Sequence, residues 1–130
     1  MRDSAIPALV LLAAAVAAPA APQEAPGPDL LDALSGRYSF GLAEKKPEGC
    51  IVTLEASGDQ AVRMGGRCKR YAVLHEITRW EPTGGGGIRL MGGKPLREIS
   101  DFSPVQDGSG VYLRGGFADD SQIYELRPPQ

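Results

Sequence analysis

Apolar and polar residues alternate with a period of two over much of the chain after Gly36. In the segments 38–42 and 50–54, every second residue is aromatic, aliphatic or cysteine, and the residues between are mostly polar or small. This alternation is typical of β-strands that bury one face. Shorter apolar runs predict further strands over the segments 61–64, 77–80, 88–91, 96–102, 111–113 and 123–126. The pattern therefore predicts about eight strands.

Short turn signals separate these segments. Examples are Gly58-Asp59, the run Gly84 to Gly87, and Asp107-Gly108. Such turns are too short for crossover helices, so neighbouring strands should be antiparallel. We expect a small eight-stranded antiparallel up-and-down β-barrel, with an open sandwich as the alternative. The segment 69–76 fits the period poorly and should be one helical turn or an irregular bridge.

The predicted interior of the barrel consists of large apolar side chains on the inward positions. These core residues are Tyr38, Phe40, Leu54, Trp80, Leu90 and Phe102. Because the strands are short, these side chains should fill the interior. The alternative is a ligand cavity of the kind found in lipocalin-type barrels.

The first 20 residues predict a cleaved signal peptide. The run Ala5 to Ala18 is almost wholly apolar and ends in small residues. Two cleavage sites are available, so the mature chain would begin at Ala18 or at Ala21, and we favour Ala21. A membrane-spanning helix is the alternative, but the run is shorter than the ~20 residues that a bilayer core requires. With no cysteine at the cleavage site, we expect no membrane anchor after cleavage and a periplasmic location.

The segment 21–33 predicts an extended N-terminal arm ahead of a barrel domain over 34–130. Residues 21–28 include no bulky apolar side chain and cannot join a core. Leu30, Leu31 and Leu34 predict one short helical turn or a docking segment within or just after the arm. About 110 residues remain after cleavage, which is enough for one domain.

The charge of the chain limits the classes of partner that it can bind, and its cysteines predict a disulfide. The formal net charge is −2 and both signs are interspersed, so neither nucleic acid nor an anionic membrane surface is an expected partner. Cys50 and Cys68 are the only cysteines and should form one structural disulfide in an oxidising compartment. Closing that loop should stabilise the fold by roughly 3 kcal/mol.

No motif for catalysis or metal binding is complete. His75 is the only histidine, and Arg79 stands where a His-Glu-x-x-His zinc motif needs its second histidine. No serine lies in a Gly-x-Ser-x-Gly turn, and no Gly-Lys-Ser/Thr follows Gly87. We therefore expect a protein that is not an enzyme and that needs neither a metal nor another cofactor.

Several segments together carry a resemblance to a known family. They are Leu34-Ser35-Gly36-Arg37-Tyr38, Cys50-Ile51-Val52-Thr53-Leu54, Cys68, Trp80-Glu81-Pro82-Thr83, Gly87-Ile88-Arg89-Leu90 and Ile123-Tyr124-Glu125-Leu126. In this order they resemble the alkaline metalloprotease inhibitor family of Gram-negative bacteria. A related barrel occurs in outer-membrane lipoproteins of alphaproteobacteria, whose lipid-bearing cysteine has no counterpart here. The resemblance implies a periplasmic eight-stranded barrel with one disulfide.

The resemblance also implies a function and a site. Members of the family block serralysin-type zinc metalloproteases by laying their mature N-terminal segment in the active-site cleft. The matching residues are Ala21, Pro22, Gln23, Glu24 and Ala25. The expected partner is such a protease, bound by a monomeric inhibitor. The alternatives are a leader without function, and a small envelope barrel that binds an apolar ligand or scaffolds other envelope proteins.

Overall fold

The computed structural model describes residues 28–129 and contains eight β-strands with a few short helical turns. The predicted signal peptide and residues 21–27 of the predicted arm lie outside the described residues. The elements in chain order are α2 (Pro28–Leu34), β1 (Gly36–Leu42), β2 (Cys50–Leu54), β3 (Val62–Gly66), the 3₁₀ turns η2 (Cys68–Arg70) and η3 (Ala72–Leu74), β4 (Ile77–Pro82), β5 (Ile88–Gly92), β6 (Arg97–Asp107), β7 (Gly110–Phe117) and β8 (Asp120–Arg127).

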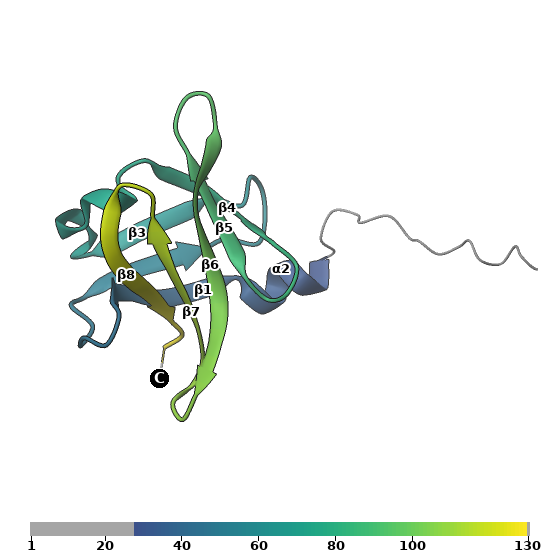
Figure 1. Ribbon diagram of the computed structural model, residues 1–130. Helices are drawn as coiled ribbons and strands as arrows, with labels where there is room; N and C mark the ends of the chain where they lie inside the picture. Colours follow the sequence, from purple (N-terminus) through teal and green to yellow (C-terminus); the bar gives the residue numbers. More distant parts are fainter. Residues whose placement is uncertain (1–27, 130) are drawn as a thin grey trace, which may run out of the picture.

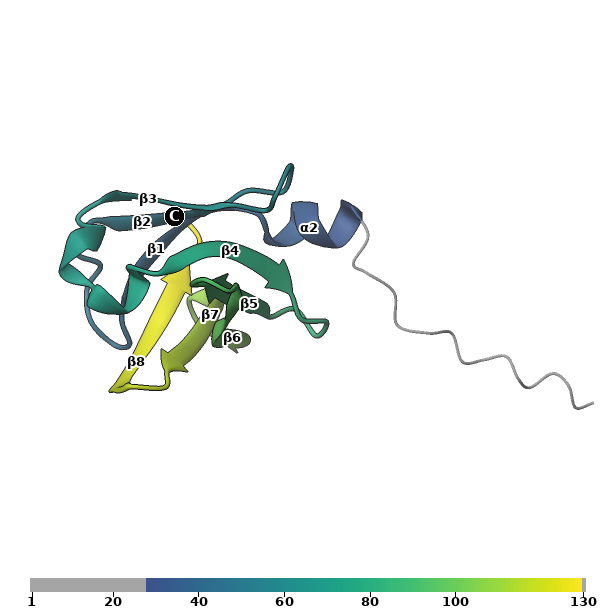
Figure 2. The same ribbon diagram turned by 90° about the horizontal axis from the view of Figure 1, so that it is seen from above.

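All eight strands belong to one antiparallel sheet that curls into a nearly closed barrel (Figures 1 and 2). The strand order is β3-β2-β1-β8-β7-β6-β5-β4, so each strand pairs with its chain neighbour except at the junction of β3 and β4. The pairing of β1 with β8, for example Phe40 opposite Leu126, joins the first strand to the last. The predicted all-β up-and-down barrel is therefore confirmed, and each predicted strand overlaps an observed one. The sandwich alternative is wrong, because one continuous sheet encloses the core.

The barrel is held together only loosely at the junction of β3 and β4, which we call the seam. An isolated bridge between Ala61 and Arg79 is the one β-pairing across the seam in residues 28–129. Beside it, the backbone N–H of Trp80 donates to the carbonyl of Gln60 at 3.1 Å. β3 and β4 are thus the two edge strands of the sheet.

The interior is filled with side chains, and all six residues expected there are buried. The largest fully buried side chains are Trp80, Phe40 and Phe102. The ring of Phe40 lies 5.0 Å from that of Tyr71 and 5.1 Å from that of Tyr124, measured between centroids. Contacts at this spacing are typical of packed aromatic clusters. The core is therefore an aromatic cluster in the middle of the barrel.

The predicted disulfide between Cys50 and Cys68 is present, with the two Cα atoms 4.4 Å apart. It ties the first residue of β2 to η2, in the connection that leads from β3 to β4. The segment 69–76, for which the sequence left a helical turn or an irregular bridge open, contains η3 and most of η2. Both turns lie at the end of the barrel opposite α2 (Figures 1 and 2).

The helix α2 corrects one boundary of the predicted arm. The segment 21–33 was expected to be extended, but residues from Pro28 onward are helical. The spacing of Leu30, Leu31 and Leu34 permitted this helical turn, and burial of leucines against the barrel accounts for it. Within residues 28–129, no helix has the length and apolar character needed to cross a bilayer.

Candidate functional site

The five residues expected to form the inhibitory arm lie outside the described residues, so their positions remain a prediction. They are Ala21, Pro22, Gln23, Glu24 and Ala25. The nearest described element is α2, which follows the arm directly in the chain. The attachment of α2 to the barrel therefore determines the point from which the arm would depart.

Helix α2 is fixed to the barrel by apolar packing and by one strong hydrogen bond. Leu31 and Leu34 are half-buried against the core. The N–H of Ser35 donates to the carbonyl of Leu31 at 2.9 Å and closes the last turn of the helix. The hydroxyl of Tyr38, on β1, donates to the carbonyl of Leu34 at 2.6 Å. Burial raises the pKa of Tyr38, so this hydroxyl stays protonated and able to donate.

A glycine makes the direct passage from helix to strand possible. Gly36 begins β1 with a φ of +125°, a conformation that L side chains rarely adopt. Only Ser35 separates α2 from β1, so the strand follows the helix directly. The N-terminal end of α2 consequently points away from the sheet (Figures 1 and 2).

Trp80 links β4 to the connection between β2 and β3. Its indole N–H donates to the carbonyl of Glu55 at 2.8 Å. The side-chain amide of Gln60 donates to the Trp80 carbonyl at 2.9 Å. These bonds satisfy the polar groups around a nearly inaccessible ring. They hold the seam closed beside Trp80, and α2 contacts the same strand.

Two tyrosines of the aromatic cluster bind carboxylates with their hydroxyl groups. Tyr71 donates to Glu48 at 2.8 Å, and Tyr124 donates to Asp120 at 2.7 Å. Burial, and then the hydrogen bond and charge of Asp120, raises the pKa of Tyr124 to about 12. The same bond, with a second one from the N–H of Gln122, lowers the pKa of Asp120. Both tyrosines therefore act as neutral donors that orient neighbouring loops.

A charged network covers the outer face of β7 and β8. The side chain of Glu125 is only 5% exposed and is bound by Arg114 at 3.1 Å and by Arg127 at 2.8 Å. The guanidinium carbon of Arg127 lies 3.8 Å from the centre of the Tyr112 ring, a cation–π contact. Two arginines thus compensate a buried carboxylate, as a buried charge requires. The network is a rigid surface feature of the barrel.

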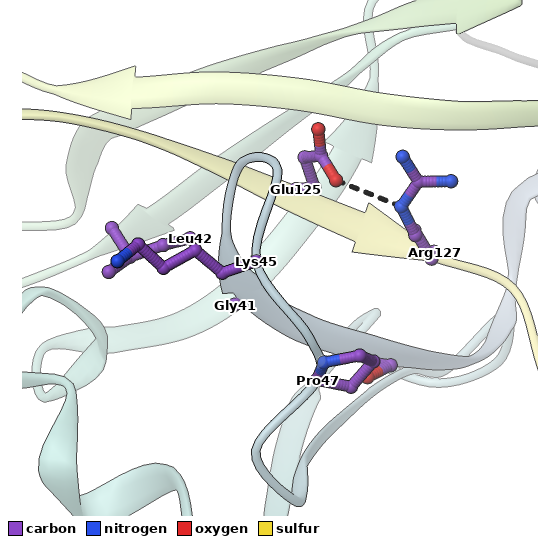
Figure 3. A pocket seen from close by; sticks show the side chains of 7 residues that line it. Gly41, Leu42, Lys45, Pro47, Glu125 and Arg127 are labelled. Atoms are coloured by element: carbon purple, nitrogen blue, oxygen red, sulfur yellow. Dashed lines mark hydrogen bonds and ion pairs between the residues drawn. The ribbon is translucent and has the colours of Figure 1, made fainter. Parts of the chain in front are cut away.

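A small hollow adjoins this network and is too small for an organic ligand. It is lined by β1, β8 and the loop that follows β1, and its volume is about 10 Å³. That volume accommodates about one water molecule. Figure 3 shows Glu125 and Arg127 joined to each other on β8, with Lys45 and Pro47 on the neighbouring loop.

His75, the only histidine, lies exposed beside η3, with its Nε2 3.4 Å from the carbonyl of Lys69. Across residues 28–129, no three His, Cys, Asp or Glu side chains are grouped so that they could hold a metal ion. Whether the protein is an enzyme stays a prediction from the sequence. In the part of the chain that the structure describes, no carboxylate forms a hydrogen bond with the ring of His75.

A groove opens along the seam, away from the Trp80–Gln60 hydrogen bond. Its volume is about 350 Å³. Met64 of β3, Leu74 of η3 and Ile77 of β4 give it an apolar lining, and Lys69 and His75 add polar groups. The groove therefore combines an unpaired strand edge, an apolar surface and basic side chains.

Sequence reasoning did not identify the Glu125 network or the seam groove. Glu125 alternates with the core residues Tyr124 and Leu126, so the pattern predicts only that it points outward. A signal for the groove was available in the poor period-two pattern of 69–76, which indicated an irregular connection between β3 and β4. Compared with known proteins, the chain matches no family model, and no curated protein or solved structure shows significant similarity to it.

Proposed function

We propose that the protein inhibits a secreted zinc metalloprotease of the serralysin type by placing the segment before Pro28 in the protease's active-site cleft. The observation that supports this most directly is the fixed attachment of α2, through Leu31, Leu34 and the Tyr38–Leu34 hydrogen bond. A segment that leaves a fixed base loses less conformational entropy on binding than one on a mobile base. The inhibitor needs no cofactor of its own.

The composition of the segment suits this role. An extended segment can lie in a protease cleft like a strand, and its prolines limit the entropy lost on ordering. Pro22 has no N–H and a fixed φ, which makes the first peptide bond a poor substrate. If the mature chain begins at Ala21, its neutral α-amine can act as a zinc ligand, since the usual pKa of such an amine is ~8.

The main alternative is a barrel that carries an apolar ligand. It is less well supported, because the ring cluster of Phe40, Tyr71, Phe102 and Tyr124 occupies the positions where such a ligand would lie.

The inhibitory proposal also requires a periplasmic location, which cell fractionation tests separately.

The direct test compares a chain beginning at Ala21 with one beginning at Pro28. The inhibition constant is measured against a purified serralysin-type protease with a fluorogenic peptide substrate. We expect the shorter chain to inhibit at least 100-fold more weakly, because it lacks the whole cleft-binding segment. Both chains should have the same melting temperature, since α2 and the barrel are retained.

A control separates the arm's sequence from its length. A chain in which residues 21–27 are all replaced by glycine or serine keeps the length of the arm but not its sequence, and it should inhibit nearly as weakly as the chain beginning at Pro28. N-terminal sequencing of the exported protein establishes whether Ala18 or Ala21 is the first residue. Equal inhibition by the chains beginning at Ala21 and Pro28 would exclude the cleft-binding mechanism.

A further inference from the structure

We propose that the seam between β3 and β4 is a docking site for an extended acidic segment of a partner protein, which adds to β3 as a further strand. This inference is independent of the proposed inhibition by the N-terminal arm. It rests on the unpaired edge of β3, the shape of the seam groove and the charge around it.

The alternation of backbone hydrogen bonds shows which residues of β3 are free to pair. The N–H of Glu55 donates to the carbonyl of Ala61 at 3.0 Å, so Ala61 faces β2. In an antiparallel ladder the intervening residues face the other way. The N–H and C=O groups of Val62 and Met64 therefore point toward the seam. The bridge between Ala61 and Arg79 engages the Val62 end of this edge. Within residues 28–129 no β-pairing joins β3 to β4 beyond that bridge, so the backbone groups of Met64 have no strand partner there.

The groove offers both space and an apolar surface. β3 and β4 are joined at Ala61–Arg79 and separate beyond it, leaving about 350 Å³ between Met64, Leu74 and Ile77. This volume lies at the lower end of the range for binding clefts. An extended segment can bond to the edge of β3 and place alternate apolar side chains in the groove, as in other cases of strand addition.

The charge around the seam selects an acidic occupant. Between Gln60 and His75 the chain has four Lys or Arg residues and no Asp or Glu, although the whole chain has a net charge of −2. Two of the four, Arg63 and Arg70, form ion pairs with Glu55 and Glu48. The other two, Arg67 and Lys69, have no carboxylate partner within residues 28–129.

The same charge disfavours a second copy of the chain as the occupant. Two β3 edges paired with each other would bring their basic side chains together, and like charges across a strand pair are destabilising. An acidic strand would instead meet Lys69, which lines the groove, as an opposite charge. The partner is therefore a different protein with an extended segment in which apolar and acidic residues alternate.

The test uses the chain beginning at Ala21 and a fluorescein-labelled peptide of three Val-Glu repeats. Binding is measured by fluorescence polarisation at low ionic strength. We expect Lys69→Glu to bind about fivefold more weakly, because it reverses the charge of a side chain that lines the groove. Lys94→Glu makes the same change on the exposed turn between β5 and β6 and should bind as the parent does.

Two further peptides separate strand addition from simple charge attraction. A peptide of three Val-Lys repeats should bind at least tenfold more weakly than the Val-Glu peptide. Three Pro-Glu repeats keep the acidic charges but lack the N–H groups of the valines, and they should also bind at least tenfold more weakly. Equal binding of either peptide, or an unchanged amide exchange rate at Met64 on adding the Val-Glu peptide, would overturn the proposal.

Discussion

The hydroxyl of Tyr38 donates a 2.6 Å hydrogen bond to the carbonyl of Leu34 and so joins the first strand to the helix that precedes it. Tyr38 also belongs to the buried core, while Leu34 lies at the end of α2. One side chain therefore connects the interior of the barrel with the element that would carry the inhibitory arm. Any change in this bond should alter the helix before it alters the sheet.

Replacing Tyr38 by phenylalanine tests this connection. The variant keeps the ring but leaves the Leu34 carbonyl without its donor, so the free energy of unfolding should fall by about 1 kcal/mol. Urea unfolding followed by circular dichroism measures the loss. Amide exchange at Ser35, whose N–H closes the last turn of α2, should accelerate, whereas exchange at Val52 in β2 should not. An unchanged rate at Ser35 would mean that leucine packing alone holds the helix.

Stability at alkaline pH should depend on Tyr124. Its pKa is about 12 in the folded protein, because of burial and the carboxylate of Asp120, whereas an unfolded tyrosine titrates near pH ~10. Between these values the folded state binds more protons than the unfolded state, so the free energy of unfolding falls as pH rises. Below the unfolded pKa the contribution is fully present. Urea unfolding from pH 8 to pH 11 should show the fall, and Tyr124→Phe should make it shallower.

The same variant should change the titration of Asp120. The hydrogen bond from Tyr124 is the main reason why the pKa of this carboxyl is lowered, with the N–H of Gln122 contributing less. In Tyr124→Phe the pKa should rise toward its ordinary value. Carboxyl chemical shifts in an NMR titration measure the pKa of Asp120. Asp107 is the control, because hydrogen bonds from Ser109 lower its pKa in the same way. If the pKa of Asp120 stayed as low as in the parent, the backbone bond would be its dominant cause.

Gly115 is required by the packing of β7 on β6. A Cβ atom built at this position collides with the carbonyl oxygen of Asp101 and lies 2.8 Å from the ring of Phe102. Gly115→Ala should therefore lower the free energy of unfolding by roughly 1–3 kcal/mol, the range for overpacked cores. Gly108→Ala is the matched control, because nothing lies within 4 Å of its Cβ position. Equal stability of the two variants in urea would contradict the close approach of Phe102.

The disulfide should supply a large share of the stability. The double variant Cys50→Ala/Cys68→Ala removes a cross-link between residues 18 positions apart, and roughly 3 kcal/mol should be lost. Thermal unfolding by circular dichroism measures the change. A reductant should lower the melting temperature of the parent protein by a similar amount and leave the variant unaffected. No effect of the reductant on the parent would show that the bridge does not contribute.

Most of the strand arrangement was predictable from local alternation. Phe40 and Val52 belong to runs in which every second residue is apolar, and short turns make chain neighbours into sheet neighbours. The position of the seam between β3 and β4 was not predictable from this alternation. β3 and β4 separate because η2 and η3 lie between them and the disulfide holds η2 against β2. That geometry depends on contacts between distant residues.

Surface sites were less predictable than the core. Alternation places Glu125 on the outer face, where a carboxylate is normally exposed, but side chains from two strands cover it. Its burial depends on the cross-strand pairing of Arg114 with Glu125, which the pattern of either strand alone does not contain. The leucines before Gly36 did indicate a docked turn, because their spacing matches a single helical face.

The pairing of β1 with β8 has a consequence for how the chain folds. The first three strands form a meander through local hairpins, and the last five strands form another. Uniting the two requires contact between residues as distant in sequence as Phe40 and Leu126, and such contacts form slowly because a long loop must close first. Folding should therefore end with the pairing of two preformed sheets along β1 and β8. The rate of this final step sets how long the aromatic core is exposed to water.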